Sequence, residues 1–232
     1  MAQKVHPLGF RLGITKRSKS TWFARRGKFH KILRSDAKIL KIWDELFVKS
    51  GKALQSQVVG LEIRRQVNLL QLNIRAGLPA QLLERDCAIF HELKKQINDL
   101  EGNLQCRVKL IKTLSAEASA IVAARQLADA IEKRVHYNRA LTQVQRNLEE
   151  AMNPTQGQRA RVRGFKIRVS GRLNGSEIAR AAWVQQGKLP LQSLNADVEY
   201  HHEKVETKYG IIGVKVWVYS GRIIYRLPPL VF

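Results

Sequence analysis

The sequence predicts an α+β protein with an extended basic N-terminal arm, a small α+β domain, and a second domain in which two helices pack on a three-stranded sheet. Three observations support this. The chain has 232 residues, 44% of them hydrophobic, which is enough to bury a core and fits one or two domains. Apolar residues recur at helical spacing in some segments and alternate with polar residues in others. Basic residues are concentrated at the N-terminus and around residues 157–188. We place the domains at 1–34, 35–113 and 114–232.

The first 34 residues are predicted to form the arm. Four residues interrupt any helix there: Pro7, Gly9, Gly13 and Gly27. They argue against an amphipathic transit peptide, although the first thirty residues are basic and free of acids. Aromatic residues among the bases suit an arm that lies along phosphates. The alternative is that Trp22 and Phe23 anchor the arm to the body of the protein.

The first domain has the expected order helix, two strands, helix, strand. Ser35 is the expected N-cap of a helix over about 36–50 that ends at Gly51. Short β-rich runs follow over 58–74, and apolar residues at three- and four-residue steps predict a helix near 81–100. Alternation over 104–110 predicts a half-buried strand.

The second domain begins at Ser115, the expected N-cap of the first of two consecutive helices. Apolar stripes run over 121–135 and 141–152, and Asn153-Pro154 ends the second helix. Strands are predicted over 165–169, 194–200 and 212–218, with a turn over 171–175 and a short helix over 176–183. Two helices and three strands make up this domain.

The charge points to a polyanionic partner. The formal net charge is +22, from 41 Lys+Arg and 19 Asp+Glu. Residues 1–41 carry twelve bases and one acid, and residues 157–188 carry eight bases and one acid. Nucleic acid or an anionic membrane surface would supply the opposite charge. There is no apolar stretch long enough to span a membrane, and the two cysteines are too few for a disulfide framework or a four-ligand zinc site.

Several strings together resemble the bacterial-type third small-subunit ribosomal protein family. They are MAQKVHPLGFRLGI at the start, STWFA at 20–24, VSGRLNGSEIAR at 169–180, the PL…L.AD..Y pattern of 190–200 and YGIIGVKVW at 209–217. The resemblance implies a type II KH domain followed by a C-terminal α+β domain particular to the family. It also implies a place on the head of the small subunit near the messenger RNA entry, with the 3′ domain of the ribosomal RNA and neighbouring head proteins as partners.

The chain departs from this family in two places. A KH domain holds single-stranded RNA with a G-x-x-G loop, but here the segment 75–84 contains only Gly77, and Glu84 and Asp86 follow. We therefore expect this domain to be a scaffold, and the one G-x-x-G, at 210–213, to be a turn with a core contact. In the helix pair the family has a basic F-R-R-A-M-K run, where this chain keeps only Arg139, so weaker messenger unwinding is expected.

Charge and resemblance together select the expected RNA contacts. The residues predicted to bind ribosomal RNA are Lys4, Arg11, Lys16, Arg17, Lys19, Arg25, Arg26, Lys28, Arg161, Arg163, Lys166, Arg168, Arg172, Arg180 and Lys188. Those predicted to lie near the messenger entry are Lys133, Arg134, Arg139 and Arg146. Strand alternation places Lys166 and Arg168 on the face opposite the core. The alternative is an ordinary solvated surface, but such surfaces mix the two signs of charge.

No catalytic residue, metal site or cofactor is predicted, so an enzyme is not expected. Cys87 and His91 share a helix face, but Cys87 also belongs to an apolar stripe and is expected to be a buried structural cysteine. His201 and His202 are adjacent on a strand and point to opposite faces. No membrane or small-molecule substrate is expected. Two rival functions remain: a free KH-type regulator that binds messages, and a nuclease or DNA-repair glycosylase.

The predicted compartment is the chloroplast, with a bacterial cytoplasm as the second choice. The chain ends at Phe232 without the basic tail common in bacterial members of the family that it resembles. The degenerate KH loop indicates rebuilt contacts, which fits an organelle ribosome.

Overall fold

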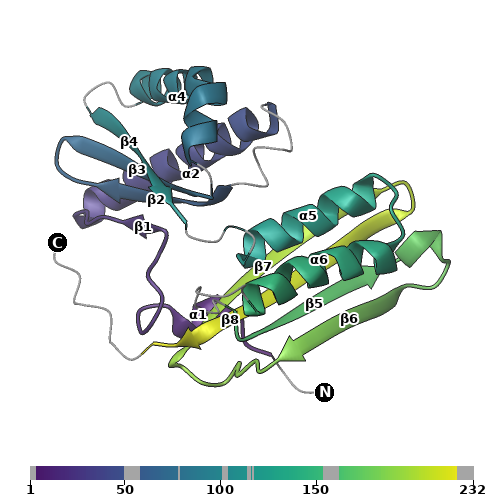
Figure 1. The fold of residues 1–232 in the computed structure, drawn as a ribbon. Helices are drawn as coiled ribbons and strands as arrows, with labels where there is room; N and C mark the ends of the chain where they lie inside the picture. Colours follow the sequence, from purple (N-terminus) through teal and green to yellow (C-terminus); the bar gives the residue numbers. More distant parts are fainter. Residues whose placement is uncertain are drawn as a thin grey trace. The chain divides into compact units, whose positions relative to one another are not determined.

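The computed structural model describes residues 4–49, 58–77, 79–100, 104–113, 116, 118–153 and 162–223. The described residues form two compact units, one of residues 18–113 and one of residues 4–17 with 116–223 (Figure 1). Each is an α+β unit, as predicted. Residues 1–34 are therefore not one arm, because 4–17 and 18–34 belong to different units.

The unit of residues 18–113 has two helices packed on a mixed four-stranded sheet. Its elements are β1 (Ser20–Thr21), α2 (Arg26–Lys49), β2 (Val58–Arg65), β3 (Leu69–Ala76), α4 (Pro79–Leu100) and β4 (Gln105–Lys112). The strand order is β1-β2-β3-β4, with β2 and β3 antiparallel and the two outer pairs parallel. Leu70, Leu72 and Ile74 of the central strand are fully buried in a core with both helices. The predicted strands and the helix over 81–100 are confirmed.

The first helix of this unit begins earlier than predicted. It starts at Arg26, so Ser35 is not an N-cap but lies inside α2. The carbonyl of Arg25 accepts from the amides of Lys28 and Phe29 and starts the helix there. The Ser35 hydroxyl instead accepts from the Arg65 guanidinium at 2.9 Å.

A buried polar cluster joins the middle of α2 to the segment before it and to β2. Asp36 is 4% exposed and accepts from Trp22 Nε1 and from Arg65 Nε, each at 2.7 Å. Trp22 thus anchors its segment to the unit, whereas Phe23 is 76% exposed. Of the two residues expected to be possible anchors, only Trp22 has this hydrogen bond to the body of the unit.

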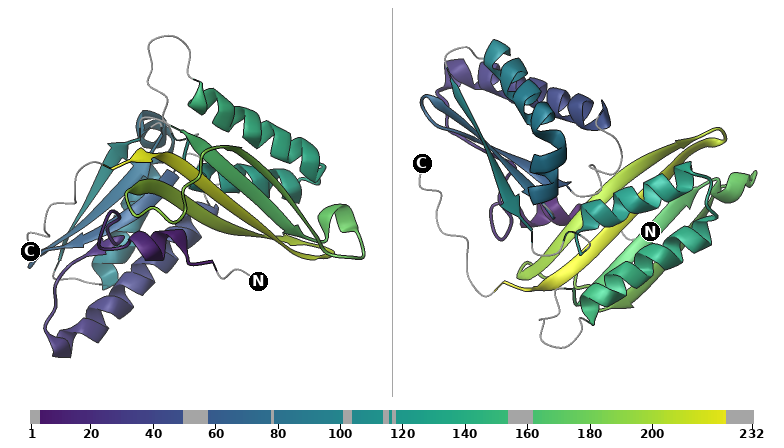
Figure 2. Two further views of the ribbon diagram at one scale, coloured as in Figure 1. Left: turned by 90° about the horizontal axis from the view of Figure 1, so that it is seen from below. Right: turned by 45° about the horizontal axis from the view of Figure 1, so that its top comes forward.

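The second unit has two helices on an antiparallel sheet, with residues 4–17 beside it. Its elements are α1 (Pro7–Arg11), α5 (Ala120–Glu132), α6 (Tyr137–Met152), β5 (Gly164–Gly171), the 3₁₀ turn η1 (Leu173–Gly175), β6 (Arg180–Gly187), β7 (Ala196–Thr207) and β8 (Gly210–Arg222). The strand order is β6-β5-β8-β7. Helices α5 and α6 lie over one face of the sheet (Figure 2) and bury Phe165, Ile167, Val214 and Val216.

Two predictions for this unit were wrong. The described sheet has four strands and not three, because the segment 176–183, expected to be a helix, contributes the start of β6. Residues of β6 pair in continuous antiparallel register with β5, from Gly171 opposite Arg180 to Gly164 opposite Gly187. That ladder gives the backbone amides and carbonyls of 180–187 their hydrogen-bond partners on β5. Helix α5 starts after Ser119, whose hydroxyl accepts from the Ile121 amide, while the expected cap Ser115 lies outside the described residues.

Candidate nucleic-acid interface

The sheet of the second unit has a face that α5 and α6 do not cover, which we call the open face. Side chains alternate between the two faces of a strand, so the residues opposite the core are identified by the strand register. The open face consists of Ala181, Trp183 and Gln185 of β6, Lys166, Arg168 and Ser170 of β5, Gly213, Lys215 and Trp217 of β8, and Tyr200, His202 and Lys204 of β7. The placement of Lys166 and Arg168 opposite the core confirms the expected strand alternation.

Basic side chains occupy directly opposed positions on the open face. One row crosses all four strands and reads Trp183, Arg168, Lys215 and His202. Like charges that face each other across a strand pair are destabilising, so the opposed Arg168 and Lys215 destabilise the free unit. Burial lowers the pKa of His202, and the charges of Lys215 and Lys204 lower it further. The row is therefore a region of positive potential that favours an anion.

Other predicted contacts lie at the two ends of the same sheet. Arg163 and Lys188 are exposed at one end, where the Lys188 amide donates to the Arg163 carbonyl. Arg172 and Arg180 lie at the other end, where Arg180 pairs with Gly171. The Arg172 guanidinium donates to the Ser176 carbonyl at 2.8 Å and sits over the Tyr209 ring, so part of its capacity is used within the protein. Arg161 lies outside the described residues.

Arg11 does not belong to an RNA-binding surface. Its side chain is fully buried and donates to the carbonyls of Pro7, Pro190, Leu191, Ser193 and Ala196. Desolvation by burial lowers its pKa, and Asp197 partly opposes this. The predicted RNA contact of Arg11 is wrong, because the guanidinium is buried and its hydrogen bonds hold the loop before β7.

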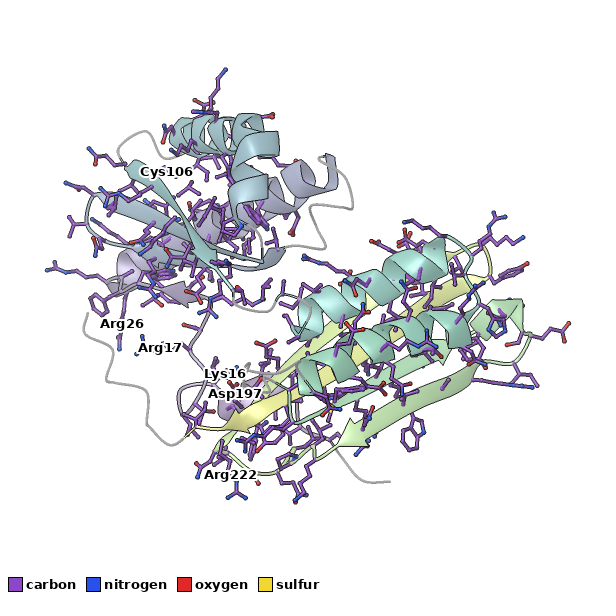
Figure 3. All side chains as sticks on the ribbon, in the orientation of Figure 1. Lys16, Arg17, Arg26, Cys106, Asp197 and Arg222 are labelled. Carbon is purple, nitrogen blue, oxygen red and sulfur yellow. The ribbon has the colours of Figure 1, made fainter. Side chains whose placement is uncertain are left out.

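Lys16 is also engaged within its unit. Its ammonium pairs with Asp197 at 2.5 Å, and Figure 3 shows the two labelled residues next to each other. Lys4 and Arg17 are exposed. Arg11 and Lys16, two of the predicted contacts, therefore have structural partners within this unit.

In the other unit, the predicted bases Lys19, Arg25, Arg26 and Lys28 are exposed. The structure adds four bases that sequence reasoning did not select as contacts and that continue from Lys28 along α2. Exposed bases follow α2 at steps of three and four residues, which places them on one helix face: Lys28, Lys31, Arg34, Lys38 and Lys41. Their spacing in the sequence could have predicted this basic helix face, but a helix that begins after Ser35 would not include Lys28, Lys31 and Arg34. Lys204 and Lys215 of the open face were likewise missed.

The four residues predicted near the messenger entry lie on the helix pair. Lys133 and Arg134 occupy the turn between α5 and α6, where Arg134 has a left-handed φ of 61°. Arg139 and Arg146 are seven residues apart on α6 and both exposed, so they share a face. The Tyr137 amide donates to the Asn174 side chain, which joins the start of α6 to the turn after Arg172.

The two glycine loops can be compared directly. In the segment expected to hold the KH loop, Gly77 is buried, Leu78 lies outside the described residues, and the side chains of Glu84 and Asp86 also lie outside them. At 210–213, Gly210 begins β8 with a φ of +126°, and Ile212 is 4% exposed. The core contact is confirmed through Ile212, whereas the turn itself is at 208–209 and the four residues 210–213 are the start of the strand.

The residues considered for catalysis or metal binding are not gathered into a site. The Cys87 side chain lies outside the described residues, and His91 is exposed. His201 and His202 lie on opposite faces of β7, and His201 Nε2 is 2.7 Å from Glu203 Oε2. In the described part of the chain, no three His, Cys, Asp or Glu side chains are close enough to hold a metal ion. None of the described helices is long and apolar enough to cross a membrane.

Comparison with known proteins identifies the family. Residues 127–218 match the family model described as "Ribosomal protein S3, C-terminal domain". The chain is 41% identical to small ribosomal subunit protein uS3c of Emiliania huxleyi, over 97% of this chain and all of that protein. It is 38% identical to uS3c of Pyropia yezoensis and 36% identical to uS3 of a Synechocystis strain, over 97% of this chain and 91% and 88% of theirs. The resemblance seen in the sequence is confirmed, and the chain belongs to the uS3 family of small ribosomal subunit proteins.

Proposed function

We propose that this protein is a structural constituent of the small ribosomal subunit, and that its open face and the exposed bases at both ends of the sheet bind ribosomal RNA. The pair Arg168 and Lys215 carries the proposal, because these two cations lie directly opposite each other on β5 and β8 and repel one another in the free protein. Phosphates would remove that repulsion. Contacts of this kind position the protein without reading bases.

Salt-dependent binding tests the proposal. We expect the full-length protein to bind the 3′ domain of small-subunit ribosomal RNA with an affinity that falls steeply as salt rises. Replacing Arg168 and Lys215 by Gln should reduce the slope of log K against log salt by about 2, since each lost phosphate contact removes about 0.9. The matched control is Lys95→Gln, an exposed base on α4. An unchanged slope in the double variant would overturn the assignment.

The ribosomal role is tested in the assembled particle. A tagged protein should sediment with small subunits on a sucrose gradient, survive a high-salt wash and leave the particle after RNase treatment. Release into the soluble fractions by salt alone would instead favour a peripheral or free RNA-binding protein. Selection from a random RNA pool separates these further, because a ribosomal protein bound by phosphates and shape should yield no short consensus.

We further propose that the turn between α5 and α6 and the exposed face of α6 lie near the messenger RNA entry. The support is the exposure of Lys133, Arg134, Arg139 and Arg146 on one connected segment. A photocrosslinker at Thr142, exposed on α6, should capture messenger RNA in programmed ribosomes. Crosslinks to ribosomal RNA alone would contradict this placement. The loss of charge around Arg139 predicts weak unwinding of structured messages.

The proposed compartment is the chloroplast stroma, where the protein would contact neighbouring head proteins of a plastid ribosome. The similarity to uS3c proteins of two algae supports this, with cyanobacterial uS3 proteins somewhat less similar. Immunoblotting of isolated plastid ribosomes tests it, and detection only in other fractions would refute it. For the chain itself we propose two domains, one of residues 18–113 and one of residues 4–17 with 116–223, and no catalytic activity.

A further inference from the structure

Trp183 is the most exposed large aromatic side chain on the open face. It lies on β6, is 60% exposed, and has Ala181 and Gln185 as its neighbours on that face of the strand. At the other edge of the sheet, by contrast, α1 packs against β7, where the His6 ring meets the Tyr200 ring edge-on at 4.9 Å. The indole thus stands in the part of the open face that this contact does not reach.

Two cations on the neighbouring strand lie beside the indole, and one of them contacts its ring. The Lys166 ammonium lies 4.8 Å from the centre of the Trp183 ring, within the range of a cation–π contact. Arg168 is directly opposite Trp183 in the register, and Gln185 is directly opposite Lys166. An aromatic ring, two cations and an amide therefore occupy a two-by-two block of adjacent positions on β5 and β6.

We propose that this block binds one unpaired nucleotide of the RNA, with its base stacked on Trp183 and its phosphates held by Lys166 and Arg168. The Gln185 amide is placed to hydrogen-bond the edge of that base. This inference rests on the proposed RNA-binding function of the open face and adds to it a contact with a base.

The charge on the block favours an RNA over a protein partner. Among the described residues of the open face and its strand ends, the acid nearest in register is Glu206, which pairs with Ile211 at the far end of β7. An indole flanked by bases matches the way proteins bind single-stranded RNA, where aromatic rings stack on bases and cations follow the backbone. A paired base does not expose its face, so the occupant is an unpaired nucleotide in a loop, bulge or end.

Three substitutions of Trp183 in the full-length protein separate stacking from other contacts. At a fixed salt concentration, Trp183→Ala and Trp183→Leu should weaken binding to a short single-stranded RNA by about 5- to 150-fold. Trp183→Phe should stay within a few-fold of the parent, because it keeps a ring. The salt slope should not change in any of them, since no phosphate contact is lost. Because the Trp183 side chain is exposed, we expect all three variants to stay folded, and circular dichroism checks this.

An abasic ribose-phosphate polymer of the same length is the decisive probe. The parent and all three variants should bind it equally, whereas Arg168→Gln with Lys215→Gln should weaken binding to both polymers. Full affinity of Trp183→Leu for RNA would show an apolar contact, and full affinity of Trp183→Ala would show no contact; either overturns the stacking site while leaving the proposed function. If the Arg168 and Lys215 variant also binds both polymers normally, the proposed function of the face fails as well.

Discussion

Replacing Arg11 should destabilise the second unit without weakening RNA binding. Three short bonds join its guanidinium to distant backbone: Nε to the Ala196 carbonyl at 2.8 Å, and Nη2 to the carbonyls of Leu191 at 2.8 Å and Ser193 at 2.9 Å. Bonds from a charged donor contribute about 1.5–3 kcal/mol each. Relaxation of the loop and entry of water recover part of that sum, so we expect Arg11→Met to cost about 3–5 kcal/mol.

The conservative variant tests whether charge or shape matters. Arg11→Lys keeps the charge but cannot reproduce a planar fork with several donors, so we expect it to lose about half as much stability, roughly 2 kcal/mol. Denaturant unfolding measures both values, and hydrogen exchange at β7 locates the loosened region. Lys4→Met is the matched control: it is an exposed base from the same segment and should leave stability unchanged.

The salt dependence of RNA binding tests whether Arg11 has a structural role alone. Under conditions where both variants stay folded, Arg11→Met should retain the parent's salt slope for ribosomal RNA. A loss of stability below about 1 kcal/mol would show that the carbonyls find other donors. A shallower slope with intact stability would restore Arg11 to the RNA-binding set and refute its structural role.

Three further predictions follow from buried or crowded positions. Asp36→Asn should destabilise the unit of residues 18–113 by about 3 kcal/mol in urea unfolding, because it removes the charge from a carboxylate that pairs with the buried Arg65 guanidinium; a loss under about 1 kcal/mol would contradict this. The hydrogen bond from His201 lowers the pKa of Glu203. The stability that the ionised Glu203 contributes is therefore present above the ordinary glutamate pKa and is lost as pH falls through the lowered value. The difference in unfolding free energy between the parent and Glu203→Gln should close in acid, and a difference that widens there would refute this role of Glu203. Gly164→Ala would place a Cβ on the backbone where β6 ends and should lower stability by about 1–3 kcal/mol, whereas normal thermal unfolding would show that the strand ends can separate.

Sequence periodicity predicted correctly the elements that bury one regular face. The helices α4 and α6 and the strands β4, β5 and β8 each bury one regular face, so their apolar residues reveal them. Strand β6 was missed because one face of it is solvent-exposed and the other only half-buried, which leaves little apolar alternation to read. Its backbone pairing with β5 alone makes it a strand.

The sequence by itself determined the α+β class, the large positive charge and the family, since composition, period and long strings of residues are local properties. Tertiary structure decided what each base does. Arg11 and Arg168 are the same residue type in two basic segments, yet one donates to backbone about 180 residues away and the other stays exposed on the open face. The partners that bury a guanidinium come from distant parts of the chain, and only the folded chain brings them together.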